Sequence, residues 1–223
     1  MFASQNTDGF DLAGQNIYIH DCNVTNFDDA IAVKPTGKTG NNPFGISCTG
    51  NLTAENMHVT YGVGMSIGSV PPEPTDNCVD GVVFRNITFA APLKTVYVKS
   101  NEGRNGGTGL IQNVRYEGIR ATDAIWWPIY VGPQQQLQPD GGGEGWWPNT
   151  VPEVTIRNVS IVDMVATGCL WGRAGALRGN VSNPHTHIDM TNVRVTGWNA
   201  SMDWVCEHTS GVATNVIPRP GCY

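Results

Sequence analysis

Short stretches of alternating apolar and polar residues recur along the chain and predict β-strands, because side chains in a strand point alternately to opposite faces. The clearest of these stretches cover residues 17–19, 82–84, 154–156 and 193–195. Many are followed by a second short apolar run, at residues 30–33, 65–67, 96–98 or 129–131. Each unit of the chain is therefore predicted to contain several short strands joined by turns.

A polar residue followed by Val or Ile marks each unit, and these marks are mostly 27 to 35 residues apart. They stand at Asn23, His58, Asn86, Asn113, Asn158 and Asn192. This spacing is typical of one coil of a parallel β-helix, in which coils stack about 4.8 Å apart and like residues form ladders. Asn tolerates left-handed backbone and can bond to the Asn of the coil above, so the repeated Asn is predicted to be structural.

The interval between Val114 and Val159 is wider than the others and contains four tryptophans and three consecutive glycines. We expect a long loop that leaves the solenoid, and long ordered loops are often functional. Its tryptophans have two interpretations, since aromatic rings can stack on sugar faces or pack into the core. They are Trp126, Trp127, Trp146 and Trp147.

The composition supports one all-β domain over residues 1–223, with 27 Gly and 14 Pro and only 14% charged residues. The net charge of −6 has the wrong sign for a general nucleic-acid binder, so no nucleic-acid partner is expected. No apolar run approaches the roughly 18 residues of a membrane helix, which predicts no membrane association. No signal peptide is visible at the start of the chain.

Six cysteines show no Cys-x-x-Cys spacing, which favours disulfides over a zinc site. A bridge between Cys48 and Cys78 is one possible pairing. Six Asn-x-Ser/Thr sequons suit a secreted glycoprotein, although Asn before β-branched residues can also be a habit of the fold. The sequons begin at Asn23, Asn51, Asn86, Asn158, Asn180 and Asn199.

Candidate chemistry lies in two acidic motifs. Asp8 stands in Asn-Thr-Asp-Gly, and Asp28 and Asp29 follow about one coil later. Stacking of those coils would gather three carboxyls on one face, where mutual repulsion raises one pKa and leaves a general acid beside a base. Isolated acidic pairs more often cap turns or bind calcium. Lys99, on a later coil, could add an ammonium beside the acids.

Four stretches, in order, resemble the signature motifs of the polygalacturonase family, glycoside hydrolase family 28. They are residues 6–9 (Asn-Thr-Asp-Gly), 27–30 (Phe-Asp-Asp-Ala), 62–70 (Gly-Val-Gly-Met-Ser-Ile-Gly-Ser-Val) and 97–99 (Tyr-Val-Lys). The resemblance implies a right-handed parallel β-helix that lacks its N-terminal coils. It also implies a secreted, monomeric hydrolase that cleaves α-1,4 bonds of pectic polysaccharide with inversion and needs no cofactor and no metal.

The resemblance also assigns roles. Asp28 would be the general acid, while Asp8 and Asp29 would activate the attacking water. Inversion typically separates acid and base by about 6.5 to 9.5 Å. Lys99 would bind a uronate carboxylate, and the substrate would also meet Asn6, Tyr97 and Arg104. The terminal cysteines resemble the family's C-terminal pair, which implies a bridge between Cys206 and Cys222.

Two positions depart from the family. The usual Gly-His-Gly contains Val63 in place of histidine, and the usual Arg-Ile-Lys begins with Tyr97 in place of arginine. A phenol offers one hydrogen bond where guanidinium forms a fork, so uronate binding should weaken or change geometry. Arg104 or His58 could compensate.

Two other functions stay open at this stage. Loss of the His and Arg positions could leave a β-helix that binds pectin or another glycan without turnover. Alternatively, the aspartates could hold calcium for a lyase, with Lys or Arg abstracting a proton; chelator sensitivity and an unsaturated product would identify it.

Overall fold

A computed structural model describes residues 6–36, 45–75, 77–103, 106–135, 147–170, 173–198 and 202–223, and these residues form two parallel sheets. The first holds β1 (Phe10–Leu12), β4 (Ile31–Val33), β6 (Met65–Val70), β8 (Val96–Ser100), β10 (Ile129–Pro133), β12 (Arg173–Arg178) and β14 (Asp203–Glu207). The second holds β2 (Gln15–His20), β3 (Asn23–Asn26), β5 (Cys48–Tyr61), β7 (Cys78–Ala90), β9 (Gly109–Thr122), β11 (Val154–Cys169), β13 (Thr186–Gly197) and β15 (Ala213–Ile217).

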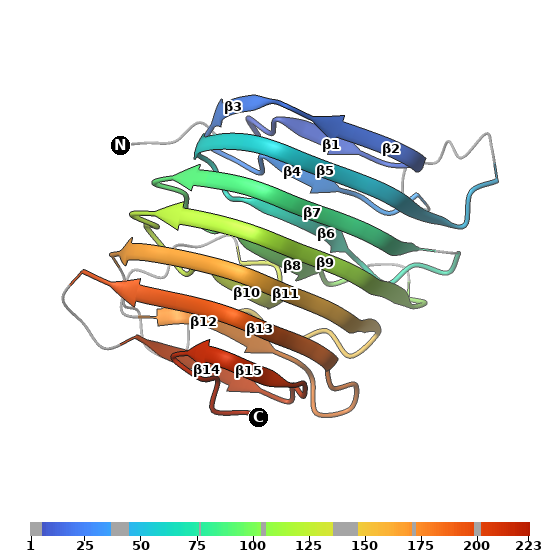
Figure 1. Ribbon diagram of the computed structural model, residues 1–223. Coiled ribbons are helices and arrows are strands. Elements are labelled where there is room, and N and C mark those ends of the chain that lie inside the picture. The colour runs from blue at the N-terminus through green and yellow to red at the C-terminus, as the bar shows by residue number, and fades with distance from the viewer. Residues whose placement is uncertain are drawn as a thin grey trace.

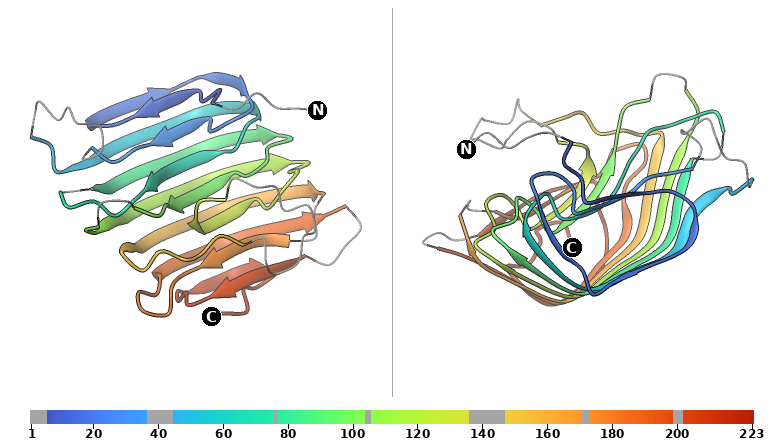
Figure 2. Two further views of the ribbon diagram at one scale, coloured as in Figure 1. Left: turned by 180° about the vertical axis from the view of Figure 1, so that it is seen from behind. Right: turned by 90° about the horizontal axis from the view of Figure 1, so that it is seen from above.

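The chain winds from one sheet to the other and back, so that each coil stacks on the preceding one (Figure 1). Seen from above, the successive coils superimpose, and the two sheets enclose a narrow interior (Figure 2). The predicted all-β parallel β-helix is confirmed. Across the described residues, we find no helix with the length and hydropathy that a membrane crossing requires.

Aliphatic ladders fill the interior. One of them runs through β5, β7, β9, β11 and β13 in register, and each of its side chains is at most 1% exposed. Its members are Leu52, Val82, Val114, Val159 and Ile188. Burial of such side chains stabilises the fold by about 1.5 to 3 kcal/mol each relative to exposure.

The repeated asparagines occupy left-handed corners at which the long strands bend, as predicted, but in two rows instead of one. The register aligns Asn51, Asn113 and Asn158 in one row and Asn86 and Asn192 in the other. Within each row the amides bond along the stack, as from Asn158 to Asn113 at 3.2 Å. The neighbouring Asn23 and His58 lie outside both rows because they follow the second corner by two residues.

These asparagine rows explain three of the six sequons, those that begin at Asn51, Asn86 and Asn158. The side-chain nitrogen of Asn51 donates to Asn16 at 2.6 Å, and that of Asn86 donates to Asn56 at 2.6 Å. Asn180 likewise donates to the Thr150 hydroxyl at 2.9 Å. Because this nitrogen is the atom that a glycan would take, the structural interpretation fits these positions. Asn199 lies outside the described residues.

Two disulfides are present, Cys48–Cys78 and Cys206–Cys222, so both pairings expected from the sequence are confirmed. The first joins paired residues of β5 and β7 with 4.7 Å between their Cα atoms. The second closes the C-terminal end over a separation of 16 residues. A loop of this size stabilises a fold by roughly 3 kcal/mol in the chain-entropy model. Cys22 and Cys169 are free thiols.

The buried ring of His185 makes the stability of the fold depend on pH. The residue is 3% exposed, and burial lowers its pKa to about 4. The ordinary pKa of histidine is near 6.5. Between this pH and about pH 4, His185 binds a proton in the unfolded chain but not in the folded chain. Stability should therefore fall as the pH drops through this window, by about 3 kcal/mol in full. Urea unfolding from pH 7 to pH 4 should show a smaller loss for His185→Met than for the unsubstituted protein.

His187 supplies the control for this prediction, because it is an exposed histidine two residues away. Its left-handed backbone, at φ 55°, suits Asn. The variant His187→Asn should keep the full pH dependence. Equal slopes for all three proteins would contradict the assignment to His185.

Candidate active site

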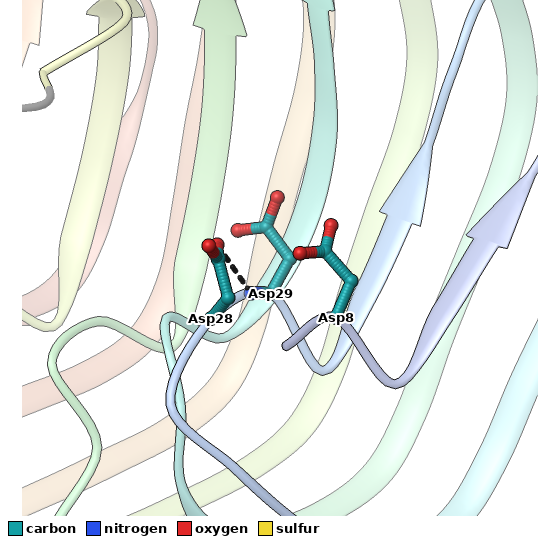
Figure 3. A group of neighbouring side chains, drawn as sticks. All are labelled: Asp8, Asp28 and Asp29. Atoms are coloured by element: carbon teal, nitrogen blue, oxygen red, sulfur yellow. Dashed lines mark hydrogen bonds between the residues drawn. The ribbon is translucent and has the colours of Figure 1, made fainter. Parts of the chain in front are cut away.

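The three predicted aspartates meet at one edge of the first sheet. Asp8 lies two residues before β1, and Asp28 and Asp29 lie in the turn before β4. Since β1 and β4 pair in parallel with Phe10 opposite Ile31, both turns reach the same edge. The amide of Gly9 donates to the carbonyl oxygen of Asp29 at 2.9 Å, which holds the two coils one rung apart. Figure 3 shows the three carboxyls side by side.

The three carboxyls are close enough for their charges to interact. One oxygen from each lies within 4.8 Å of the others. This is shorter than the separation of about 6.5 to 9.5 Å expected of an inverting pair. Asp8 and Asp28 are half-buried, whereas Asp29 is 1% exposed. Only the first two can therefore meet a ligand directly.

Asn26, which the sequence analysis did not single out, holds the turns that carry the acids. Its buried amide nitrogen donates to the carbonyl oxygens of Thr7 at 3.1 Å and of Asp28 and Asp29 at 2.8 Å each. Asp28 is fixed separately, because its side chain accepts the backbone amides of Asn6 at 3.0 Å and of Asp29 at 2.8 Å. An Asn two residues before Asp-Asp was the available signal for this role.

Asp29 is held from the next two coils. Ser66 of β6 donates its hydroxyl to one carboxylate oxygen at 2.6 Å, and Lys99 of β8 donates its ammonium to the other at 2.5 Å. Both side chains of the ion pair are buried, at 5% exposure for Lys99 and 2% for Asp29. Lys99 thus lies at the acid cluster, as predicted, but its charge is directed at Asp29. Ser66 was missed because its role depends on the stacking of coils.

The prediction that Tyr97 meets the substrate does not agree with the structure. The residue is 2% exposed, and its hydroxyl donates to the carbonyl oxygen of Gln135 at 3.1 Å and accepts the amide of Gln135 at 2.9 Å. Both capacities of the phenol are used, so it offers no bond to a ligand. Asn6 is exposed and contacts the site through its backbone amide. Arg104 lies outside the described residues.

The Gly-Val-Gly turn brings the third coil against the fourth. Gly64 has φ +100°, and a Cβ there would lie 2.7 Å from the carbonyl oxygens of Lys94 and Thr95, so only glycine fits without a shift. Between the glycines, Val63 packs against an aromatic cluster that includes Tyr97 and Tyr130. The position of the family histidine is therefore apolar.

Three of the four tryptophans in the wide interval between Val114 and Val159 lie in the described residues, and all three pack against the protein. Trp126 is 7% exposed and Trp127 is 3% exposed. Trp147 is half-buried and stacks on Trp127 with 4.8 Å between ring centroids. The packing interpretation therefore applies to Trp126 and Trp127. Trp146 and most of the glycine-rich loop lie outside the described residues.

One carboxyl of the cluster, that of Asp8, stays protonated at mildly acidic pH. Burial, followed by the negative charges of Asp28 and Asp29, raises the pKa of Asp8 to about 6. Asp11 acts in the same direction, and the ammonium of Lys34 lowers the pKa. Oxygens at this spacing could also ligate a cation. The Lys99 ammonium already neutralises Asp29, however, which weakens that use of the site.

The family model of glycosyl hydrolases family 28 matches residues 2–215. A probable endopolygalacturonase D of Emericella nidulans is 35% identical over 166 residues, which is 74% of this chain and 28% of that protein. A probable exopolygalacturonase C of Aspergillus niger is 38% identical over 127 residues, covering 56% of this chain and 26% of the relative.

A rhamnogalacturonase A of Emericella nidulans is 26% identical over 207 residues, covering 92% of this chain and 35% of the relative. Among solved structures, the endo-xylogalacturonan hydrolase from Aspergillus tubingensis matches with a TM-score of 0.72 and 19% identity. That match covers 95% of this chain and 54% of the other. The chain thus spans about a third or less of the curated relatives named here, and the structural likeness bears on the fold.

Proposed function

The chain belongs to glycosyl hydrolases family 28, and from this we propose that it hydrolyses glycosidic bonds of a pectic polysaccharide. The observation that carries the proposal is the meeting of Asp8, Asp28 and Asp29 on adjacent turns, with a proton retained to about pH 6. Hydrolysis of a glycoside requires a carboxyl that gives a proton and a carboxylate that takes one. No cofactor is required for this chemistry.

We assign the steps as follows. Asp28 gives its proton to the glycosidic oxygen as the bond from that oxygen to the anomeric carbon breaks. A water molecule attacks the same carbon from the opposite face and loses its proton to ionised Asp8. The resting site holds its proton on Asp8, and we propose that a bridging water passes this proton to Asp28 before the reaction, since oxygens of the two carboxyls lie within 4.8 Å of each other.

We propose inversion because the assigned steps use water to attack the anomeric carbon, with Asp8 as its base, although the carboxyl oxygens lie closer together than in a typical inverting pair. A retaining mechanism needs a carboxylate that attacks the anomeric carbon. The Asp29 oxygens are buried and bonded to Ser66 and Lys99, so Asp29 instead fixes the charge beside the other two carboxyls. We propose that Lys99, whose ammonium is bonded to Asp29, attracts a bound uronate carboxylate through its charge. We also propose that Tyr97 does not contact the saccharide.

The named relatives act, by their names, on polygalacturonate, rhamnogalacturonan or xylogalacturonan, and the proposal is limited to this pectic class. Two disulfides support secretion, since such bonds persist in oxidising compartments. We propose a secreted protein that acts as a monomer. Asn23 is exposed and lies outside both asparagine rows, which makes it the candidate for a glycan.

The proposal is tested by incubating the protein with polygalacturonate, rhamnogalacturonan and xylogalacturonan. We expect release of reducing ends from at least one, with the inverted anomer formed first in proton NMR spectra. Binding to these polymers without any release would favour a glycan-binding protein. An unsaturated product would indicate a lyase, and first formation of the retained anomer would contradict the assigned steps.

Activity should fall as the pH rises through about 6, because the reaction begins with the proton that Asp8 stores. The measurement is kcat/KM against pH on the best of the three polymers. Substitution of two charged residues near Asp8 should shift the midpoint of this fall in kcat/KM in opposite directions. Asp11→Asn removes a negative charge and lowers the midpoint, whereas Lys34→Met removes a positive charge and raises it. Movement of both midpoints in one direction would argue against Asp8 as the group that titrates.

A further inference from the structure

Lys94 is a buried cation that the proposed mechanism does not use. It lies in the turn before β8 and is 0% exposed. Continuing the register of β4, β6 and β8 places it beside Val63, which in turn lies beside Asp29. Lys94 therefore stands on the ladder of the acid cluster, two coils from Asp29.

Aromatic rings surround its ammonium. The Lys94 nitrogen lies 4.3 Å from the ring centroid of Trp126, 4.5 Å from that of Tyr97 and 5.7 Å from that of Tyr130. No described residue offers this nitrogen a hydrogen bond. Cation–π attraction stabilises a desolvated ammonium by about 2 kcal/mol, well below the cost of burying an isolated charge. A lysine in this position is costly, which points to a use for its charge.

The ring of Tyr97 connects Lys94 to the catalytic cluster. The ammonium of Lys99 lies 4.6 Å from the centroid of the same ring. Tyr97 is fixed by its two bonds to Gln135 and by an edge contact with Tyr130 at 5.4 Å. The two ammonium groups are thus held near each other by one immobile ring, and one of them is bonded to Asp29.

We propose that Lys94 is a positioning residue, whose positive charge acts on the Lys99–Asp29 ion pair at the shared Tyr97 ring and thereby tunes that pair beside the acid cluster. The Lys99 ammonium and the Asp29 carboxylate act in turn on the charge of Lys94. The catalytic meaning of this inference rests on the proposed hydrolase function.

The groups around Lys94 determine the pH at which it loses its charge. Burial and the Lys99 ammonium lower the pKa of Lys94 to about 7, while the charges of Asp29 and Asp28 act against this shift. The phenols of Tyr97 and Tyr130 have raised pKa values, mainly because they are buried, and stay neutral there. Lys94 therefore loses its charge near pH 7, and the force on the ion pair is lost with it.

The test is carbon-13 NMR of the full protein labelled at lysine Cε and aspartate Cγ. The chain has four lysines, so Lys94→Met identifies the Lys94 signal directly. In the unsubstituted protein we expect that signal to titrate near pH 7, and the Asp28 and Asp29 carboxyl signals to show an inflection at the same pH. Lys94→Met should remove the inflection from the carboxyl signals.

Lys34→Met is the matched control, because this cation lies near Asp8 and pairs with Asp11 at 3.4 Å. It should keep the inflection near pH 7. The pH profile of kcat/KM should carry the same inflection and lose it in Lys94→Met, which a role in packing would not produce.

Lysine signals that all stay constant from pH 5 to pH 9 would overturn the inference, as would carboxyl signals without the inflection. The unsubstituted protein decides this point even if Lys94→Met fails to fold. A protein without hydrolase activity but with linked titrations would refute the proposed function and leave the coupling of Lys94 to the cluster standing.

Discussion

Asp28→Asn should lower the rate of pectic hydrolysis at least about 1,000-fold, since an amide cannot give a proton to the leaving oxygen. The amides of Asn6 and Asp29 donate to different carboxylate oxygens of Asp28, at 3.0 and 2.8 Å. Asn keeps one of these two acceptors, so the chain should still fold but lose about 1 kcal/mol of stability. The measurement is reducing-end release at pH 5, together with the unfolding midpoint in urea.

Asp21→Asn is the control for this prediction. Asp21 is exposed, has left-handed backbone at φ 54° and bonds to His20, so Asn suits its position. This variant should retain full activity. If Asp28→Asn also kept more than a tenth of the activity, Asp28 would not be the acid, and Asp8→Asn would then test whether Asp8 gives its stored proton directly.

Lys99→Met should reduce the free energy of unfolding by about 3 to 5 kcal/mol, because it leaves the Asp29 carboxylate buried without its counter-charge. The loss is large because both side chains of the pair are at most 5% exposed. Urea unfolding at pH 7, followed by circular dichroism, measures it. A second substitution, Asp29→Asn, removes the stranded charge and should restore more than half of the loss.

Arg115→Met provides the comparison for a surface pair. Arg115 and Glu117 lie 2.9 Å apart with about two fifths of each side chain exposed, and loss of such a pair costs less than about 1 kcal/mol. If Lys99→Met cost no more than Arg115→Met, the Lys99–Asp29 pair would not stabilise the fold. Activity then separates the roles, since a Lys99 that only stabilises would leave kcat/KM of the folded protein unchanged.

The coil repeat and the meeting of the acids could be predicted from the sequence because both are local. A left-handed corner favours Asn through its own backbone conformation, and one coil between Asp8 and the pair Asp28 and Asp29 places them on neighbouring turns. The two rows of corners were merged into one because each coil has two bends and a one-dimensional spacing does not distinguish them.

The environment of the acid cluster depended on contacts between distant segments. Whether Tyr97 faces a ligand or the core is decided by Gln135, 38 residues later, which covers its hydroxyl. Asp29, 70 residues earlier, accepts a hydrogen bond from the Lys99 ammonium and so decides whether that ammonium is available to a ligand. The family comparison pointed to these positions but could not show that both side chains are buried.

Periodicity, turn chemistry and the order of motifs are properties of neighbouring residues, so the chain by itself determined the parallel β-helix and the gathering of its three aspartates. Tertiary structure decided which charges act on them. The outward side chains of a coil take their surroundings from adjacent coils and from the loops that cover them, and burial governs both pKa and pairing. Lys94 shows this best, since its sequence context resembles that of any exposed lysine and its aromatic enclosure comes from β8, β10 and the turn between coils.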